Sequence, residues 1–467
     1  MKARLNKRAS HLWSSLILFI AFASSCLVAP ATANTVSKAS DASTPVLVKF
    51  SRSYSSKERV DAMRAKLLLN DNNGHRQQKL GEDYREIKAF EHMPMVTLSV
   101  TKHELESLRQ DPTLEVVENK LHRPLLAQSV NRVYPSKSTS PFHGANQWVV
   151  AVLDSGIDAS HPMLSGKIVS QACYSNGGAQ PSTSSLCPGG VSATTSSNSG
   201  QPCSLDGCAH GTQVAGVVAS NGAAFDGVAK DANLISIQVY SQVNDESFCF
   251  PELSCLGAYT SDIIAGLERV YNLRNHFDIA AVTVSLGSDE LYSGSCDNQP
   301  EKAIIDQLKT AGVAVVAAAG NSGNTSRMQS PACISSAIAV AATFDNSDTP
   351  WTGNNISDEI DFFAPGVNIT STSLNNGFET GTGTSLAAPH VAGAIAVLKH
   401  ASPELGVNGT LSLLKRHGPT VSQHAVSRRR LSLTSALSEL FTNIPNPNNS
   451  SASAFLPAVI FLLGDED

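Results

Sequence analysis

The chain has 467 residues, of which 42% are hydrophobic and 16% are charged, so it is long enough for two or three globular domains with sizeable cores. Its formal net charge of -6 is uneven: residues 1–128 contain 19 Lys or Arg against 13 Asp or Glu, whereas residues 129–467 contain 15 against 27. Because the main body is acidic, we expect no nucleic-acid partner.

The first 33 residues have the three parts of a secretory signal peptide. The basic start MKARLNKRAS precedes the apolar stretch LWSSLILFIAFASSCLVA, and Ala31-Thr32-Ala33 forms a small-residue cleavage site. Residues 1–33 therefore predict export. A transmembrane anchor is the alternative, but serines interrupt the apolar stretch and it is shorter than the roughly 20 residues of a membrane span. Lipidation at Cys26 is a second alternative, which the preceding Ala-Ser-Ser disfavours.

Cysteine usage agrees with export. Apart from Cys26, the chain has eight cysteines, all between residues 173 and 333. In an exported protein this even number predicts four disulfides, although eight cysteines allow 105 pairings. Because most lie in Gly-, Ser- and Pro-rich stretches, we expect local bridges that pin loops. Zinc is the alternative, but no CxxC pair occurs. The expected bridges are Cys173–Cys187, Cys203–Cys208, Cys249–Cys255 and Cys296–Cys333.

Residues 34–128 are predicted to form a small α+β domain without cysteine. Apolar and alternating runs predict three strands, an amphipathic pattern predicts one helix, and Thr101 with Glu104 in capping-box positions predicts another. An ordinary domain that stays attached is one interpretation. Residues 129–147, rich in Ser, Pro and Asn, predict a linker. The strands are expected at 46–50, 95–100 and 114–118, and the helices at 56–69 and 101–110.

The stretch WVVAVLDSGID, residues 148–158, opens the next unit. Its continuous apolar run predicts a buried strand of a parallel sheet, and Asp154 ends that run. Because α/β folds place their sites at the carboxyl ends of parallel strands, Asp154 is a candidate functional residue. Asp158 is expected to belong to the following turn.

Two further helices are predicted to begin at residues with catalytic chemistry. His210 precedes Gly211-Thr212 and an apolar helical pattern, and Ser385 begins a longer helix of small apolar residues. We expect Pro389 in the first turn of that helix. Free backbone N–H groups and the helix dipole at this N-terminus favour a nucleophile whose attack creates an oxyanion. Taken alone, each residue could equally be structural, Ser385 as an N-cap.

Asp154, His210 and Ser385 occur in the chain order of the subtilisin triad. The segments VAVLDSGID, HGTQVAG and GTSLAAPHVAG resemble the three signature segments of the subtilisin family of serine proteases. The resemblance covers roughly residues 140–440. It implies a peptidase domain at residues 129–440, with a three-layer α/β/α architecture and a mostly parallel central sheet.

The resemblance implies further site residues. The segment VAVVAAAGN, residues 313–321, is similar to the oxyanion-hole segment of the family, so Asn321 would donate its side-chain amide to the developing oxyanion. The predicted strand at 282–288 would bind an extended substrate as an added strand. Ser285, Leu286 and Gly287 would form one wall of the primary specificity pocket, and Ala318, Ala319 and Gly320 the facing side.

By its position, the unit at residues 34–128 resembles the propeptide of subtilisin-type proteases. The implied role is that of an intramolecular chaperone and transient inhibitor, which is later cut off. The predicted function is thus a secreted, self-processing serine endopeptidase that acts on proteins or peptides, and we expect a monomer. The alternatives are an inactive homologue that binds peptides without cutting them, and a structural, disulfide-rich secreted protein.

The chain departs from the family pattern at four positions. Gln213 stands where many members have a second His, and Leu386 and Ala388 replace the usual Met and Ser. We expect activity to survive these changes. Met163 stands where members often place a calcium-ligating Asp, and the loop after residue 220 is short. We therefore expect no cofactor, and the usual strong calcium site is doubtful.

The C-terminal part is less informative. Residues 402–417 predict a helix, and residues 431–440 are expected to close the peptidase domain. Residues 441–467 predict an Asn-, Pro- and Ser-rich linker and a short apolar tail. The apolar run at 455–463 is too short to span a bilayer, so we expect a packed strand or a tail removed later.

Overall fold

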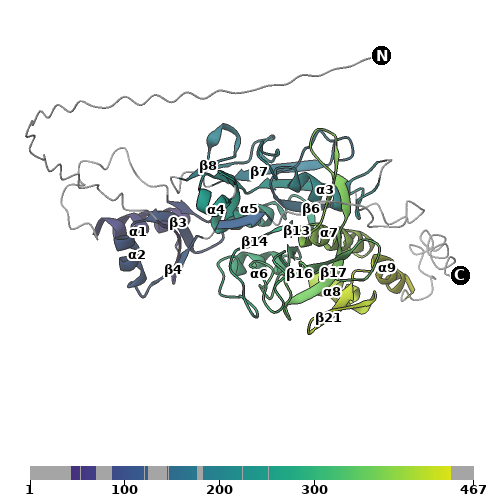
Figure 1. The fold of residues 1–467 in the computed structure, drawn as a ribbon. Helices are drawn as coiled ribbons and strands as arrows, with labels where there is room; N and C mark the ends of the chain where they lie inside the picture. Colours follow the sequence, from purple (N-terminus) through teal and green to yellow (C-terminus); the bar gives the residue numbers. More distant parts are fainter. Residues whose placement is uncertain are drawn as a thin grey trace, which may run out of the picture. The chain divides into compact units, whose positions relative to one another are not determined.

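The computed structural model describes residues 44–52, 54–69, 87–119, 121–124, 145, 147–175, 182–222, 225–250 and 252–442 (Figure 1). The predicted signal peptide, most of the predicted linker and the apolar tail lie outside these residues. Residues 41–467 cluster as one compact unit. The predicted domain boundary near residue 128 therefore stays a prediction.

The N-terminal segment, residues 44–124, contains a four-stranded antiparallel sheet in the order β2-β3-β1-β4. Its core consists of apolar side chains of β1 and β3 together with Met63 of the first helix, all of them buried. The predicted strands and helices of this segment are confirmed. Their bounds are β1 (Thr44–Phe50), α1 (Ser56–Leu69), β2 (Lys88–Ala89), β3 (Met95–Val100), α2 (Lys102–Arg109) and β4 (Leu114–Glu118).

The predicted capping box at the start of α2 is present. The Glu104 backbone N–H donates to Thr101 Oγ1 at 3.3 Å, and the Thr101 N–H donates to Glu104 Oε2 at 2.7 Å. The two residues thus satisfy each other's free backbone donors, and α2 begins where the sequence predicts.

A ten-stranded sheet forms the centre of the following part, in the order β20-β21-β17-β16-β15-β13-β6-β10-β7-β9. All neighbouring strands from β21 to β7 run parallel, and only the edge strands β20 and β9 are antiparallel to their neighbours. The strands are β6 (Trp148–Asp154), β7 (Ile168–Tyr174), β9 (Ala193–Thr194), β10 (Asn233–Gln238), β13 (Asp278–Val284), β15 (Ala314–Ala318), β16 (Ile338–Phe344), β17 (Ile360–Val367), β20 (Thr420–Gln423) and β21 (Val426–Arg430).

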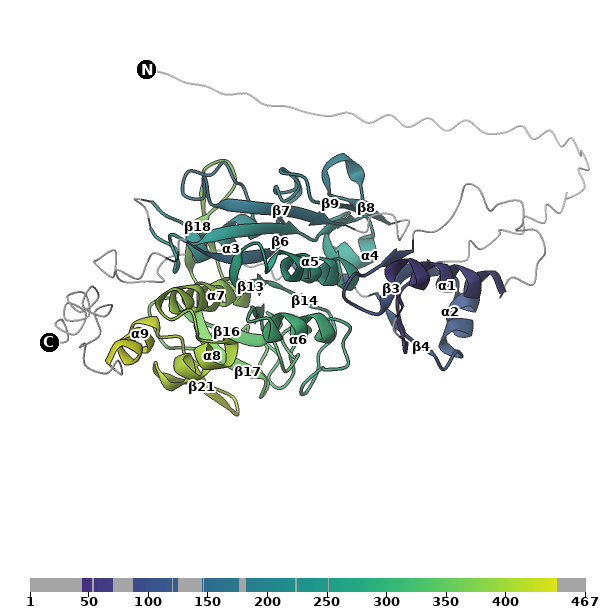
Figure 2. The ribbon, with the colours of Figure 1, turned by 180° about the vertical axis from the view of Figure 1, so that it is seen from behind.

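Helices cover both faces of this sheet, as the two views in Figures 1 and 2 show. Successive residues of β6 join different cores: Val150 and Val152 pack with α3, α7, α8 and α9, whereas Val149, Ala151 and Leu153 pack with α5 and α6. The predicted three-layer α/β/α architecture is thereby confirmed. The helices are α3 (His210–Ala219), α4 (Glu246–Cys249), α5 (Thr260–Leu273), α6 (Lys302–Thr310), α7 (Thr384–Ala401), α8 (Val407–Arg416) and α9 (Leu433–Thr442), with one 3-10 turn at Pro188–Gly190.

Two predicted elements have different bounds. The strand expected at 282–288 is interrupted at Ser285, so that β13 ends at Val284 and β14 (Leu286–Ser288) belongs to another sheet. The helix expected at 402–417 begins only at Val407, because Ser402 ends α7 and Pro403 and Gly406 disfavour a continuous helix. Both differences concern the bounds of an element: β13 ends earlier than predicted, and α8 begins later than predicted.

A second sheet has the strand order β14-β5-β12-β11-β8. Its strand β5 belongs to the N-terminal segment and pairs antiparallel with both β14 and β12. A further hairpin, β18–β19, leads into α7. These strands are β5 (Leu121–Pro124), β8 (Thr183–Ser185), β11 (Ser241–Val243), β12 (Cys255–Tyr259), β18 (Ile369–Thr372) and β19 (Phe378–Gly381).

All four predicted disulfides are present: Cys173–Cys187, Cys203–Cys208, Cys249–Cys255 and Cys296–Cys333. Their Cα–Cα distances of 5.3 to 5.6 Å are typical of disulfides. Three of them close loops of 14 residues or fewer, as expected for bridges that pin loops.

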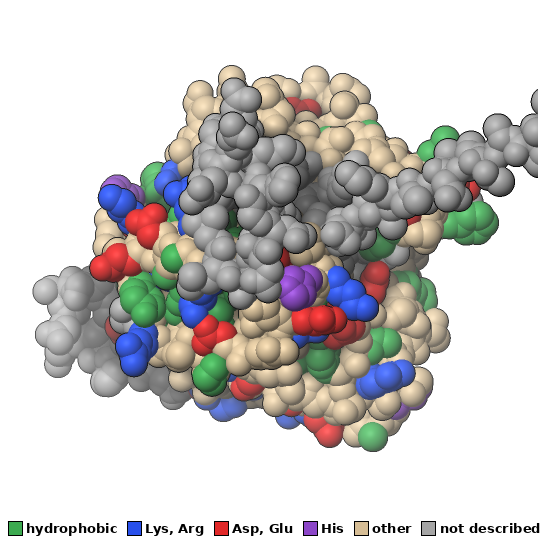
Figure 3. Space-filling model, turned by 90° about the vertical axis from the view of Figure 1, so that its left-hand side faces the viewer, with side chains coloured by type: hydrophobic (Ala, Val, Ile, Leu, Met, Phe, Trp, Pro, Cys, Tyr) green, Lys and Arg blue, Asp and Glu red, His purple; other side chains and the backbone are tan. Residues whose placement is uncertain are grey.

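None of the helices in the described ranges is long and apolar enough to cross a bilayer. On the face that Figure 3 shows, the described acidic and basic side chains are interspersed and form no continuous basic patch.

Helix α7 contains a buried histidine that makes stability depend on pH. His390 is 0% exposed, and its Nδ1–H donates to the Leu386 carbonyl at 2.7 Å. Burial lowers the pKa of His390 from 6.5 to about 3. Below pH 6.5 this histidine is therefore protonated in the unfolded chain, whereas in the folded chain it is protonated only below about pH 3. From this residue alone we expect the free energy of unfolding to fall by about 2 kcal/mol between pH 7 and pH 5.

Denaturant unfolding at these two pH values would test this expectation in a Ser385→Ala chain, which cannot digest itself through the expected nucleophile. His390→Asn keeps a donor for the Leu386 carbonyl but has no proton to gain. It should be less stable at pH 7 and should lose about 2 kcal/mol less on acidification. An equal acid-induced loss in both chains would contradict the prediction.

Candidate active site

The predicted catalytic side chains lie at one edge of the parallel sheet. Asp154 is the last residue of β6, and His210, the first residue of α3, is bonded to it. Ser385 is the second residue of α7, which packs against α3. Since β6, β13 and β15 run parallel, residues that directly follow them reach this same carboxyl edge.

A buried hydrogen-bonded pair orients the imidazole. His210 Nδ1 lies 2.8 Å from Asp154 Oδ1 and 2.9 Å from Oδ2, and the two residues are 2% and 0% exposed. Because a carboxylate only accepts, Nδ1 carries the proton that it donates. His210 Nε2 is buried without a hydrogen-bond partner in the described part of the chain. The geometry therefore leaves Nε2 as a lone-pair acceptor.

A glycine lets α3 close onto β6. A Cβ atom on Gly211 would meet the carbonyl oxygen of Gly156 and would lie 3.2 Å from the Asp154 Cβ. Only a residue without a side chain fits here unless the backbone moves. The short distance between His210 and Asp154 thus depends on the Gly211 that follows the histidine.

The start of α7 differs from the prediction in the place of its proline. The helix begins at Thr384, so Pro389 is its sixth residue and lies in the second turn. Pro389 has no N–H for the Ser385 carbonyl, four residues earlier. The Ser285 hydroxyl donates to that carbonyl instead, at 2.9 Å. The proline therefore frees the serine's carbonyl for a bond to the residue between β13 and β14.

Asn321 is anchored beside Ser385 through Thr384. Its Oδ1 accepts from the Thr384 backbone N–H at 3.0 Å and from Thr384 Oγ1 at 2.8 Å, while Gly320 N–H donates to the same hydroxyl at 3.1 Å. Asn321 Nδ2 is buried without a partner among the described residues. Both hydrogen-bonding sites of the Oδ1 atom are thus engaged, and the amide N–H groups stay available as donors.

The structure places the two predicted pocket walls at the carboxyl ends of the neighbouring strands β13 and β15. Ser285 links β13 to β14, and Leu286 and Gly287 begin β14, where they pair with Pro124 and Arg123 of β5. On the facing side, Ala318 ends β15 and Ala319 N–H donates to the Val340 carbonyl at 3.0 Å. Gly320 follows with a φ of 109°, a conformation that favours glycine.

Two residues and one strand near the site were not predicted from the sequence. Thr384 is the first of these residues, and its backbone N–H and hydroxyl hold Asn321 Oδ1. The strand β12 was not predicted, yet it pairs with the opposite side of β5. Gln329 lies near the primary pocket, in an irregular segment without a pattern. The Cys249–Cys255 pair was the one signal that the residues before β12 are held in place.

The structure shows the contacts of three residues that depart from the family pattern, Gln213, Leu386 and Ala388. Gln213 Nε2 donates to Glu379 Oε2 at 2.7 Å and so joins α3 to β19. Leu386 and Ala388 are 0% exposed and pack in the core with α3. All three side chains therefore hold elements together beside the candidate site.

The residues around Met163 do not fit a calcium ion. Met163 is 7% exposed, and a Cβ on Gly222 would lie 2.8 Å from its Cγ. The Met163 carbonyl accepts from Asn221 N–H at 3.0 Å. Calcium takes six to eight oxygen ligands, which a thioether cannot supply. Nor do the described residues contain a group of three or more His, Cys, Asp or Glu side chains able to hold a metal.

Comparison with known proteins agrees with this geometry. A family model described as the Subtilase family matches residues 145–430. The chain is 30% identical over 326 residues to Subtilisin NAT of Bacillus subtilis subsp. natto, covering 68% of this chain and 73% of that protein. It is 29% identical to Minor extracellular protease Epr of Bacillus subtilis (strain 168) over 72% of this chain, and it spans 48% of Epr's length.

Solved structures share the fold. Fervidolysin from Fervidobacterium pennivorans, described as a keratinolytic enzyme related to subtilisin, aligns with a TM-score of 0.60 at 20% identity over 85% of this chain and 61% of that one. A protease from Pseudoalteromonas arctica PAMC 21717 aligns with a TM-score of 0.51 at 24% identity over 67% of this chain and 99% of that one.

The thioether side chain of Met163 predicts stability without calcium, because it cannot supply an oxygen ligand. A calcium ion present at about 100 times its Kd would add about 2.7 kcal/mol to the free energy of unfolding, and its removal would lower the stability by the same amount. We expect the melting temperature and the activity of the processed chain to be unchanged after dialysis against EDTA. Dialysis against calcium-saturated EDTA is the control. A lower melting temperature that added calcium restores would contradict the prediction.

Proposed function

Because the chain belongs to the subtilase family, we propose that it is a secreted serine endopeptidase in which Ser385, His210 and Asp154 cleave peptide bonds. The observation that carries the proposal is the buried His210–Asp154 pair. It leaves His210 Nε2 unpartnered among the described residues, at the sheet edge where Ser385 lies in the first turn of α7. Protein or peptide substrates are proposed with it.

In the proposed reaction, His210 Nε2 takes the hydroxyl proton of Ser385 while Ser385 Oγ attacks the carbonyl carbon of the peptide bond. Asp154 keeps the imidazole oriented and stabilises its charged form. The proton then passes to the leaving amine as the C–N bond breaks. Water then attacks the acyl-enzyme while His210 Nε2 takes its proton, and His210 returns that proton to Ser385 Oγ as the ester bond breaks.

Two donors are proposed for the oxyanion of the tetrahedral intermediate. One is Asn321 Nδ2, since its amide oxygen is held by Thr384. The other is the Ser385 backbone N–H, which lies in the first turn of α7. The positive end of the helix dipole adds to this stabilisation.

We further propose that the N-terminal segment inhibits the enzyme until it is removed. Supporting this, β5 lies as a middle strand between β14 and β12, with Gly287 opposite Arg123 and Ala258 opposite His122. An extended peptide that adds to a sheet edge uses such backbone pairing. While β5 occupies this position, a substrate cannot pair with the same strands.

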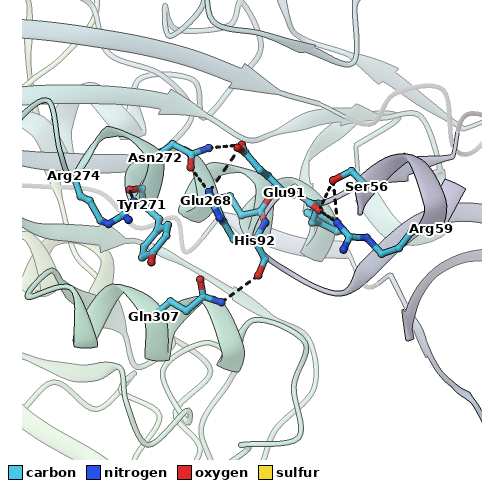
Figure 4. A network of polar contacts seen from close by, with 10 residues as sticks. Ser56, Arg59, Glu91, His92, Glu268, Tyr271, Asn272, Arg274 and Gln307 are labelled. Carbon is cyan, nitrogen blue, oxygen red and sulfur yellow. Dashed lines mark hydrogen bonds and ion pairs between the residues drawn. The ribbon is translucent and has the colours of Figure 1, made fainter. Parts of the chain in front are cut away.

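Polar contacts support a specific docking of this segment, and Figure 4 shows them in detail. Glu268 of α5 accepts backbone N–H groups from Glu91 at 3.2 Å and from His92 at 2.8 Å. Burial raises the pKa of Glu268, although these two N–H groups act in the opposite direction. Gln307 of α6 donates to the His92 carbonyl at 3.3 Å. Thus one turn of the N-terminal segment is held by two helices.

A second docking contact supplies the missing cap of α5. The N-cap residue Tyr259 makes no side-chain capping bond. Instead, Asn119 Oδ1 accepts the Ser261 backbone N–H at 2.8 Å, and Asn119 Nδ2 donates to Ser261 Oγ at 2.7 Å. Asn119 is 2% exposed. The N-terminal segment therefore caps the helix that directly follows strand β12.

Export remains part of the proposal. The predicted signal peptide lies outside the described residues, but four disulfides favour an oxidising compartment. The related protease Epr is named as extracellular. The competing proposal is an inactive homologue that binds peptides. Peptide binding alone would not require the buried His210–Asp154 pair.

Self-processing is the first prediction of this proposal. Intact-mass analysis and N-terminal sequencing should show that the wild-type chain loses its N-terminal segment, with the new N-terminus a few residues after Pro124. Ser385→Ala should keep the segment because it lacks the nucleophile. Identical cleavage of both chains would assign maturation to another protease, and no cleavage of either would favour the inactive homologue.

Docking through Asn119 is the second prediction. Removing its two buried hydrogen bonds and the helix cap should cost about 2 kcal/mol, or roughly a 30-fold weaker complex between the cleaved segment and the enzyme. Activity measured at several concentrations of the processed enzyme and its cleaved segment would give the affinity of this complex for the wild type and for Asn119→Ala. Glu106→Ala, at an exposed position of α2, is the control. Equal inhibition in both variants would contradict the role of Asn119.

A further inference from the structure

A small disulfide ring, residues 203–208, directly precedes His210. The bridge Cys203–Cys208 spans a sequence separation of 5, and Cys208 lies two positions before the histidine. Within this 203–208 ring, the Cys208 N–H donates to the Leu205 carbonyl at 3.2 Å, and the Leu205 N–H donates to Cys208 Sγ at 3.2 Å. The ring therefore fixes the backbone from which the histidine continues.

The 203–208 ring and a serine replace a side-chain cap at the start of α3. The N-cap residue Ala209 makes no side-chain capping bond. The first N–H groups of a helix need partners from outside the helix. Here the His210 N–H donates to the Gly207 carbonyl at 3.1 Å, and the Gly211 N–H donates to Ser155 Oγ at 3.0 Å. Helix α3 thus begins where the ring and Ser155 hold it.

Ser155 joins the 203–208 ring to the His210–Asp154 pair. The serine is 0% exposed, and its hydroxyl donates to the Cys208 carbonyl at 3.1 Å. Its backbone N–H donates to Asp154 Oδ1 at 2.7 Å, and the same oxygen lies 2.8 Å from His210 Nδ1. One buried serine therefore connects the Cys208 carbonyl, the Asp154 carboxylate and the first turn of α3.

The two cysteines of the bridge differ in exposure. Cys208 is 1% exposed, whereas Cys203 is partly buried and precedes the exposed Ser204. A reductant therefore reaches Cys203 first. The Leu205 N–H that donates to Cys208 Sγ would stabilise the negative charge of a leaving thiolate, because hydrogen bonds to ionised groups are stronger. The bridge is thus accessible at one sulfur and has a stabilised leaving group at the other.

We propose that the Cys203–Cys208 disulfide, acting through Ser155, positions His210 for catalysis, so that full activity requires the oxidised bridge. Cys208 and Ser155 act as positioning residues through the His210–Asp154 pair. When the bridge opens, the Cys208 carbonyl and the start of α3 lose their fixed place, and a shift of about 1 Å in a catalytic group can cost about 100-fold in rate. This role rests on the proposed peptidase function and adds a redox requirement to it.

A dithiol such as dithiothreitol would open the bridge by thiol–disulfide exchange. Its thiolate attacks Cys203 Sγ, the S–S bond to Cys208 breaks, and Cys208 leaves as a thiolate. The second thiolate of the reductant then attacks the mixed disulfide and releases the Cys203 thiolate. The two protons that the dithiol loses pass to the cysteines. Both cysteines are thereby reduced to thiols, and the dithiol is oxidised to a cyclic disulfide.

Two double variants, assayed as processed enzymes, would test the proposal. Cys203→Ser/Cys208→Ser should lower kcat for a peptide substrate by about 10- to 100-fold and leave KM within about 2-fold. Cys249→Ser/Cys255→Ser is the control, since it removes a ring of nearly the same size, with a sequence separation of 6. The control should keep kcat within about 2-fold of the wild type, although it loses a similar constraint on the unfolded chain.

A double-mutant cycle would test the route through Ser155. Ser155→Ala should lower kcat by about 10-fold or more, because the Cys208 carbonyl and the Gly211 N–H lose their common partner. Added to Cys203→Ser/Cys208→Ser, the same change should lower kcat by less than about 2-fold further, since residues that act as a unit are not additive. Losses that multiply in full would overturn the coupling between the bridge and the serine.

Reduction of the processed wild type gives a measurement that does not depend on the folding of a variant. Activity should fall as alkylation and mass spectrometry of parallel samples detect free thiols at Cys203 and Cys208. Full activity with both thiols labelled, or an equal loss of kcat in the two double variants, would overturn the inference and leave the proposed function standing. A processed wild type that hydrolyses no peptide would contradict the proposed function, and the inference with it.

Discussion

The hydrogen bond from Ser285 to the Ser385 carbonyl joins the two halves of the site. Pro389 removes the helical donor that this carbonyl would otherwise have, and Ser285 replaces it from the point where β13 ends and β14 begins. This contact therefore joins the start of α7 to the junction of β13 and β14. Since α7 is buried along nearly its whole length, the serine cannot move without disturbing the core.

The position between β14 and β12 is proposed both for binding of an extended substrate and for inhibition by the N-terminal segment. Both strands offer backbone groups at a sheet edge, and such edges bind extended chains. In this structure β5 fills the position, Asn119 caps α5, and Glu268 and Gln307 hold the turn at His92. The segment proposed to inhibit the enzyme thus uses the backbone pairing proposed for a substrate, and adds contacts to two helices.

Buried polar groups in this protein are kept at specific places by neighbouring small residues. Gly211 lets His210 reach Asp154, and Gly287 and Gly320 leave room for Gln329. Disulfides hold the loops around these elements, and Met163 stands where family members often place a calcium-ligating Asp. In the described chain, the site therefore depends on close packing and covalent bridges.

The sequence by itself determined the fold class and the candidate catalytic residues through three short segments that resemble the subtilisin family, around Asp154, His210 and Ser385. It determined the disulfide pairs through cysteines that are close in sequence. Only the tertiary structure decided the role of β5, the capping of α5 by Asn119 and the place of Gln329. Each of these joins segments that are far apart in the chain or lacks any periodic pattern. The interruption at Ser285 and the position of Pro389 in α7 also escaped prediction, since no local pattern shows that Ser285, 100 residues earlier, bonds to the carbonyl that Pro389 leaves without its helical donor.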